Sequence, residues 1–128
     1  MQTERHKRIA LFFIITSIGL GALGAHSLKE ILSENELHSL ETGIRYQLFH
    51  GLALLVLALN TNKFNANLKK SIDIMTIGIC LFSFSIYLLS IQEVTKISMS
   101  FLGPITPIGG LLLIISWIIL FFSIKKTD

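Results

Sequence analysis

The sequence predicts an all-α protein: an integral membrane four-helix antiparallel bundle with both termini cytoplasmic. Hydrophobic residues make up 52% of the chain and charged residues 15%, and the mean hydropathy is +0.68, values that a small soluble domain does not show. Four apolar runs each approach the roughly 20 residues that a membrane-spanning helix needs. These runs occupy most of the 128 residues, so we expect a single membrane domain over residues 1–128.

The first predicted span, 9–26, directly follows a basic tail. A secretory signal peptide has a similar layout, with small residues near Ala22 as a cleavage site. The rest of the chain is equally apolar, which favours a retained span. Small residues lie on two opposite faces of this helix, and helices in lipid associate through close packing and hydrogen bonds. We therefore expect neighbours on both sides of the first helix, one face carrying Ser17, Gly21, Gly24 and Ala25 and the other Gly19, Ala22 and His26.

The second predicted span, 43–60, contains an apolar run of about 24 Å at 1.5 Å per residue, shorter than the ~30 Å hydrocarbon core. Its helix must therefore include flanking residues. Ser33 followed three positions later by Glu36 is a capping box, which predicts that the helix begins there, outside the bilayer. The sequence predicts the third span over 72–91.

The fourth predicted span, 104–124, has Pro104 and Pro107 near its start. A missing backbone N–H is least costly in the first turn of a helix. The connections between all four spans are short, so successive helices are expected to be antiparallel neighbours.

The basic residues indicate the orientation of the chain. The positive-inside rule places Lys and Arg on the cytoplasmic side. The two termini and the 60–71 connection then face the cytoplasm together, and the opposite side carries mainly glutamate. The predicted cytoplasmic side holds Arg5, Lys7, Arg8, Lys63, Lys69, Lys70, Lys125 and Lys126, and the opposite side holds Lys29, Arg45 and Lys96 with Glu30, Glu34, Glu36, Glu41 and Glu93.

Each span carries a stripe of small or polar residues that can face the other helices. With alternating helix directions, the polar residues nearest the glutamate side are expected to meet in the outer half of the bilayer. Within this cluster, Tyr46 is a plausible partner for His50, which lies four residues further along the same helix. The candidate polar cluster is His26, Tyr46, Gln47, His50, Tyr87 and Thr106, and the candidate helix-packing residues are Gly21, Gly24, Gly109 and Gly110.

Several segments resemble the signature of a known family. The stretches at 21–26, 46–50, 82–88 and 106–110, with Ser116 and Trp117, are similar in order and over nearly the whole chain to the domain of unknown function 423 family. The members of that family are uncharacterised small multi-pass proteins of the bacterial cytoplasmic membrane. The resemblance implies a four-span protein of that membrane and brings no established reaction, substrate or cofactor.

Three functions are compatible with the polar cluster. The first is a structural clasp in which His, Tyr and Gln hydrogen-bond between helices. The second is binding or permeation of a small molecule or proton, since intramembrane ionisable groups often mark pathways. Permeation through so narrow a bundle would require a homo-oligomer. Asp73 could then be a gate, and otherwise it is a counter-charge to Lys69 and Lys70. The third is a redox protein in which His26 and His50 ligate a haem.

Other functions receive less support from the sequence. A zinc site would need His26, His38 and His50 to converge, and no clustered ligand motif is present. The serines of the third span have no base nearby in the sequence, so a catalytic nucleophile is not indicated. We expect no metal, no cofactor, no catalytic residue and no nucleic-acid partner; the expected partner is the lipid bilayer.

Overall fold

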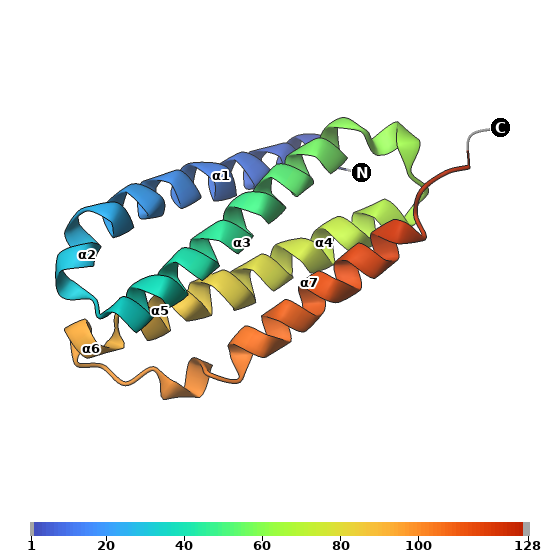
Figure 1. Ribbon diagram of the computed structural model, residues 1–128. Coiled ribbons are helices and arrows are strands. Elements are labelled where there is room, and N and C mark those ends of the chain that lie inside the picture. Colours follow the sequence, from blue (N-terminus) through green and yellow to red (C-terminus); the bar gives the residue numbers. More distant parts are fainter. Residues whose placement is uncertain (1, 127–128) are drawn as a thin grey trace.

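The computed structural model describes residues 2–126 and consists of four long helical rods that run side by side (Figure 1). The first rod is α1 (Thr3–Ala25) and the second is α3 (Glu34–Leu59), with the short α2 (Ser27–Ile31) between them. The third rod runs without a break through α4 (Asn67–Ile79), the π-helical turn η2 (Cys80–Phe84) and α5 (Ser85–Ser90). The fourth is α7 (Ile105–Phe121); the remaining short elements are η1 (Thr61–Lys63), α6 (Gln92–Thr95) and η3 (Ser100–Leu102).

The structure confirms the all-α prediction and the number of spans. Four helical stretches are long and apolar enough to cross a membrane: Thr3–Ala25, Glu34–Leu59, Asn67–Ser90 and Ser100–Phe121. The described residues 2–126 form no β-strand, only an isolated bridge between Phe64 and Ile124. The helices extend beyond the apolar runs at several ends because polar flanks can continue a helix outside the apolar region.

The predicted capping box explains why α3 begins so early. The Ser33 side chain accepts a hydrogen bond from the Glu36 backbone N–H, and the Glu36 carboxylate accepts one from the Ser33 backbone N–H at 2.8 Å. Two backbone donors that the first turn would otherwise leave unpaired are satisfied in this way. At the start of α7 fewer backbone donors need a partner, because Pro104 and Pro107 have no backbone N–H.

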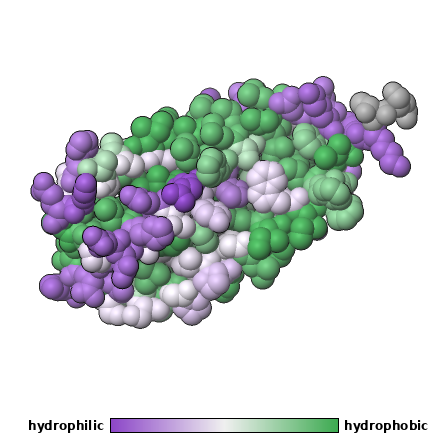
Figure 2. Space-filling view, viewed as in Figure 1, coloured by the Kyte–Doolittle hydropathy of each residue, from purple (hydrophilic) through white to green (hydrophobic). Residues whose placement is uncertain are grey.

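On the face shown in Figure 2, polar residues gather at the two ends of the molecule, and hydrophobic residues cover much of the surface between them. One end, which we call the lysine-rich end, contains both termini and the connection between α3 and α4 (Figure 1). The other, the glutamate-rich end, contains α2, α6 and the start of α3. Large apolar side chains such as Ile15, Phe49 and Phe121 are more than half exposed along the rods, as expected for helices that face lipid.

The apolar core lies in the half of the bundle near the lysine-rich end. Ala10 of α1, Leu54 of α3 and Ile72 and Met75 of α4 are at most 1% exposed there. Leu120 of α7 belongs to the same cluster of buried apolar residues. Buried polar side chains lie on both sides of this core, with Gln47, Ser83, Ser85 and Ser90 toward the glutamate-rich end.

The order of packing differs from the prediction for α1. This helix packs mainly against α3, whereas α7 packs mainly against α4 and η2, so α3 and the third rod are the central pair. The face of α1 with Gly19, Ala22 and His26 is exposed, and a Cβ added at Gly19 would meet nothing within 4 Å. Gly19 and Ala22 therefore bring no second neighbour onto α1 within the described chain.

The glycines differ sharply in how closely another helix approaches them. A Cβ on Gly109 would collide with the backbone of Leu81 and Phe82, whereas one on Gly21, Gly24 or Gly110 would make ordinary contacts at 3.6–4.0 Å. Of the four glycines predicted to pack helices, only Gly109 has no space for a Cβ atom. Two glycines outside the predicted set are also closely approached: a Cβ on Gly51 would be 3.2 Å from Ile14, and one on Gly78 would be 2.9 Å from Leu113.

Candidate functional site

A fully buried glutamine joins three helices at the middle of the bundle. Gln47 of α3 donates from Nε2 to the Phe13 carbonyl at 2.9 Å and to Thr16 Oγ1 at 2.6 Å, both on α1. Its Oε1 accepts a hydrogen bond of 2.6 Å from the Tyr87 hydroxyl on α5. Gln47 is 0% exposed, and both ends of its amide are paired. We call this set of groups the Gln47 network.

Two serines add direct bonds between helices. Ser83 in η2 donates to the Gly43 carbonyl of α3 at 2.8 Å, and Ser71 of α4 donates to the Ser116 carbonyl of α7 at 2.8 Å. Both serines are 0% exposed. Hydrogen bonds of this kind stabilise helix association in lipid, where the hydrophobic effect between helices is absent.

The π-helical turn η2 lies where α7 approaches most closely, beside Gly109. A π-turn disturbs the regular pairing of backbone carbonyls. Ser85 Oγ donates to the carbonyls of Leu81 and Phe82, at 2.5 and 3.0 Å. Its single proton is thereby used, so the 2.7 Å contact with Thr106 Oγ1 requires Thr106 to donate. The turn is thus tied to the start of α7.

His50 connects α3 to α7 through Trp117. The Trp117 indole N–H donates to His50 Nε2 at 3.0 Å, and His50 Nδ1 lies 2.8 Å from the Tyr46 carbonyl. An indole is only a donor and a carbonyl only an acceptor, so the imidazole is neutral, with its proton on Nδ1. The Tyr46 ring stacks on His50 at 6.0 Å. The tyrosine therefore contributes its backbone and ring face, and the side-chain hydrogen-bond partner is Trp117.

Replacing His50 by leucine is expected to change the environment of Trp117. The substitution removes the acceptor of the indole N–H, so the fluorescence emission of this residue, the one tryptophan in the chain, should shift and the stability should fall by about 1 kcal/mol. His38→Leu, on the same helix but outside this contact, serves as the control. An emission spectrum unchanged by His50→Leu would contradict the assigned hydrogen bond.

The six residues of the predicted polar cluster do not lie at one level. Gln47 and Tyr87 bond to each other, and Thr106 contacts Ser85, which lies two positions before Tyr87 on the third rod. His50 lies toward the lysine-rich end, because its neighbour Gly51 packs against Ala10, Phe13 and Ile14 in the N-terminal half of α1. His50 is therefore offset from Gln47 toward the lysine-rich end, and sequence position alone does not fix such offsets between neighbouring helices.

His26 is remote from His50. It caps the end of α1 and is exposed, two residues after Gly24, which faces Leu40 of α3. Leu40 and His50 are ten positions apart, about 15 Å along a helix. The two imidazoles therefore cannot ligate one haem iron in this structure. Residues 2–126 likewise contain no group of three or more His, Cys, Asp or Glu side chains that could hold a metal ion.

A further histidine, outside the predicted polar cluster, lies near the lysine-rich end. His6 of α1 is 6% exposed, and its Nε2 is 3.3 Å from Asp73 Oδ1 of α4. Lys69 donates to the other oxygen of Asp73 at 2.5 Å. Asp73 is therefore paired with Lys69, as a counter-charge would be, and also with His6. The position of His6 within a basic tail gave no sign that it would be buried.

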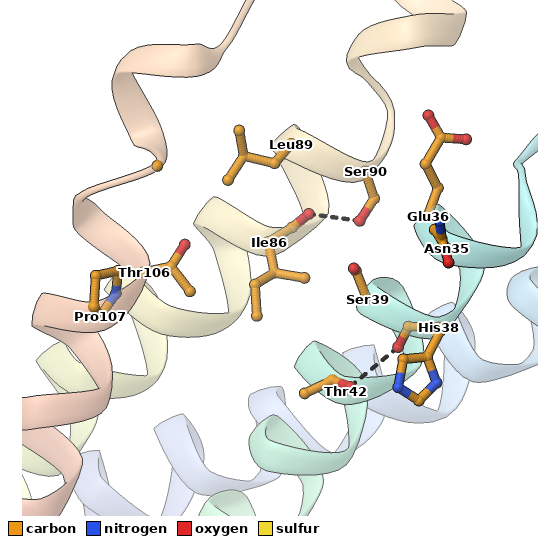
Figure 3. A pocket seen from close by; sticks show the side chains of 11 residues that line it. Asn35, Glu36, His38, Ser39, Thr42, Ile86, Leu89, Ser90, Thr106 and Pro107 are labelled. Atoms are coloured by element: carbon orange, nitrogen blue, oxygen red, sulfur yellow. Dashed lines mark hydrogen bonds between the residues drawn. The ribbon is translucent and has the colours of Figure 1, made fainter.

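At the glutamate-rich end, a cleft of about 560 Å³ opens between α3, α5 and the start of α7 (Figure 3). Ile86, Leu89 and Pro107 provide apolar walls, and most of its polar side chains come from the first turns of α3. Asn35, His38 and Ser39 are exposed there, and their side chains make no hydrogen bond with the described residues 2–126. The remaining lining residues are Glu36, Thr42, Ser90, Gly103 and Thr106.

The fold and the polar network define a small multi-pass membrane protein whose intramembrane polar groups are mostly paired with one another. Residues 20–110 match the family described as "Protein of unknown function (DUF423)". The chain belongs to this family, as its signature segments predicted.

Bacterial relatives carry names consistent with this assignment. UPF0382 membrane proteins from Staphylococcus epidermidis and Haemophilus influenzae are 38% and 39% identical over 110 residues, which cover 86% of this chain and 86% and 85% of the relatives. The UPF0382 membrane protein YwdK of Bacillus subtilis is 37% identical over 114 residues, 88% of this chain and 89% of the relative. No solved structure matches. The chain is a bacterial multi-pass membrane protein, and these names state no reaction or ligand.

Proposed function

We propose that this chain is a non-catalytic membrane protein that binds a small amphiphilic molecule in the cleft at the glutamate-rich end. The Gln47 network and the bonds around it act as a structural clasp that holds the walls of the cleft in place. The observation that carries the proposal is the cleft itself, where unpaired polar side chains at the end of the bundle adjoin apolar walls from two of its rods.

The pairing of the network supports the clasp. A permeation path or a catalytic site needs polar groups that are free to meet an ion, a water or a substrate. Gln47, Tyr87 and Ser83 instead use their polar atoms on neighbouring helices. Among the buried side chains of residues 2–126, only His6 Nδ1 lacks a partner, and His6 lies at the other end of the bundle.

The cleft has the two kinds of surface that an amphiphile needs. Its polar side chains lie where α3 emerges toward the glutamate-rich end, and Ile86 and Leu89 continue the apolar surface of the rods. A headgroup can therefore meet Asn35 or Ser39 while an acyl chain follows the apolar walls.

Filling the cleft tests this function. Ser39→Trp places a large side chain at an exposed lining position and is expected to weaken the binding of single-chain phospholipids at least about tenfold, measured by native mass spectrometry in a neutral detergent. Ser27→Trp, at an exposed position of α2 outside the cleft, is the matched control. If Ser39→Trp binds these lipids as the wild type does, the cleft is not the binding site.

The orientation of the chain in the membrane is also part of the proposal, with the lysine-rich end in the cytoplasm. The distribution of Lys and Arg supports it. Alkaline phosphatase, which is active only outside the cytoplasm, is expected to be inactive when fused after Ala66 and active when fused after Lys96. Activity at the first junction and none at the second would reverse the orientation.

A further inference from the structure

We propose that the cleft selects bilayer lipids whose headgroup carries a primary ammonium, with Glu36 as the group that recognises it. This inference rests on the proposed amphiphile binding and names the class of ligand. It follows from which atoms of the cleft are still free to form hydrogen bonds, and from the charge of its one carboxylate.

Glu36 presents one free carboxylate oxygen. Its Oε2 accepts the hydrogen bond from the Ser33 backbone N–H that completes the capping box. Its Oε1 has no hydrogen-bond partner within residues 2–126, and no Lys, Arg or His forms an ion pair with Glu36 in that part of the chain. The side chain is partly exposed and lines the cleft. An ammonium group there would meet a carboxylate that no cationic side chain of residues 2–126 pairs with.

Three of the four side-chain hydroxyls that line the cleft, those of Thr42, Ser90 and Thr106, are already committed as donors. Thr42 donates to the His38 carbonyl at 3.1 Å and Ser90 to the Ile86 carbonyl at 2.8 Å, as the dashed lines in Figure 3 show. Thr106 donates to Ser85, whose own proton is used on the Leu81 and Phe82 carbonyls. A hydroxyl has one proton and two lone pairs, so all three can offer only lone pairs to a ligand.

The free Glu36 oxygen and the lone pairs of these three hydroxyls therefore favour a ligand group that is rich in donors. A primary ammonium has three N–H donors and a positive charge, and hydrogen bonds between charged groups are stronger than neutral ones. A quaternary ammonium carries the same charge without any donor. Asn35 and Ser39 keep donors of their own, which can meet the phosphate of the same headgroup.

Three single-chain phospholipids separate charge from hydrogen bonding in the test. Lysophosphatidylethanolamine has a primary ammonium, lysophosphatidylcholine a quaternary one, and lysophosphatidylglycerol none. For the wild-type protein, native mass spectrometry is expected to show the first binding at least about tenfold more tightly than either of the others. Equal binding of the ethanolamine and glycerol lipids would overturn the inference, and equal binding of the ethanolamine and choline lipids would overturn the role of the N–H donors.

The variant Glu36→Gln tests the residue without removing the helix cap, since glutamine also completes a capping box. It is expected to abolish the preference for the ethanolamine lipid. Glu34→Gln, in the same turn but outside the cleft, should retain the preference. A preference that survives Glu36→Gln would overturn the inference.

The Ser39→Trp variant separates failure of the two proposals. If all three lipids bind alike but Ser39→Trp weakens their binding, amphiphile binding stands and the headgroup assignment fails. If Ser39→Trp has no effect on lipid binding, both proposals fail.

Discussion

Replacing Gly109 by alanine is expected to destabilise the protein by about 2–3 kcal/mol, because the added methyl group has no space. A Cβ at this position would lie 2.8 Å from both the Leu81 carbonyl carbon and the Phe82 Cα. These are backbone atoms of the π-helical turn, so no side-chain rotation relieves the clash. Helix α7 must move away from η2, which also strains the bond between Ser85 and Thr106.

Gly110→Ala is the matched control for this substitution. A Cβ there would lie 3.6 Å from the Phe82 ring, an ordinary contact, and alanine is the better helix former. We expect a change within about 0.5 kcal/mol. The measurement is reversible unfolding in mixed detergent, followed by circular dichroism. Equal effects of the two substitutions would show that α7 does not approach η2 as described.

Replacing Gln47 by leucine is expected to cost about 2 kcal/mol, which corresponds to three hydrogen bonds at about 0.6 kcal/mol each within the membrane. Leucine is similar in size, so packing is largely kept. The Tyr87 hydroxyl loses its acceptor, and α1 loses the two bonds that its Phe13 carbonyl and Thr16 hydroxyl accept from α3. The free energy of unfolding in mixed detergent measures the effect.

Two tyrosines provide the control for this prediction. Tyr87 donates its hydroxyl proton to Gln47, whereas the hydroxyl of Tyr46 makes no hydrogen bond with residues 2–126. Tyr87→Phe should therefore lower the stability and Tyr46→Phe should leave it unchanged. If both phenylalanine variants behave alike, the Gln47 network does not stabilise the bundle as a clasp would.

The four spans could be predicted from the sequence because hydropathy and length are local properties. The same holds for the start of α3, since the Ser33–Glu36 capping box lies within four consecutive residues. The orientation stays a prediction that rests on an equally local signal, the clusters of lysine and arginine.

The partners of the buried polar groups could not be predicted, because they depend on the offset between helices. The stripe through Gln47 and His50 indicated which face of α3 turns inward. It could not show that Gln47 would reach the Phe13 carbonyl, a backbone group without any sequence signal, or that His50 would meet Trp117. Likewise, the spacing of the glycines did not distinguish Gly109 from Gly110, because the π-helical turn opposite them is a tertiary feature.

The central claim is that buried polar side chains hold the helices of this bundle to one another. A double-mutant cycle of Gln47→Leu and Tyr87→Phe, with the free energy of unfolding measured for all four proteins, tests it most directly. The hydrogen bond between α3 and α5 predicts that the double variant loses less stability than the sum of the single variants, by about 1 kcal/mol. Effects that add within about 0.3 kcal/mol would contradict the claim.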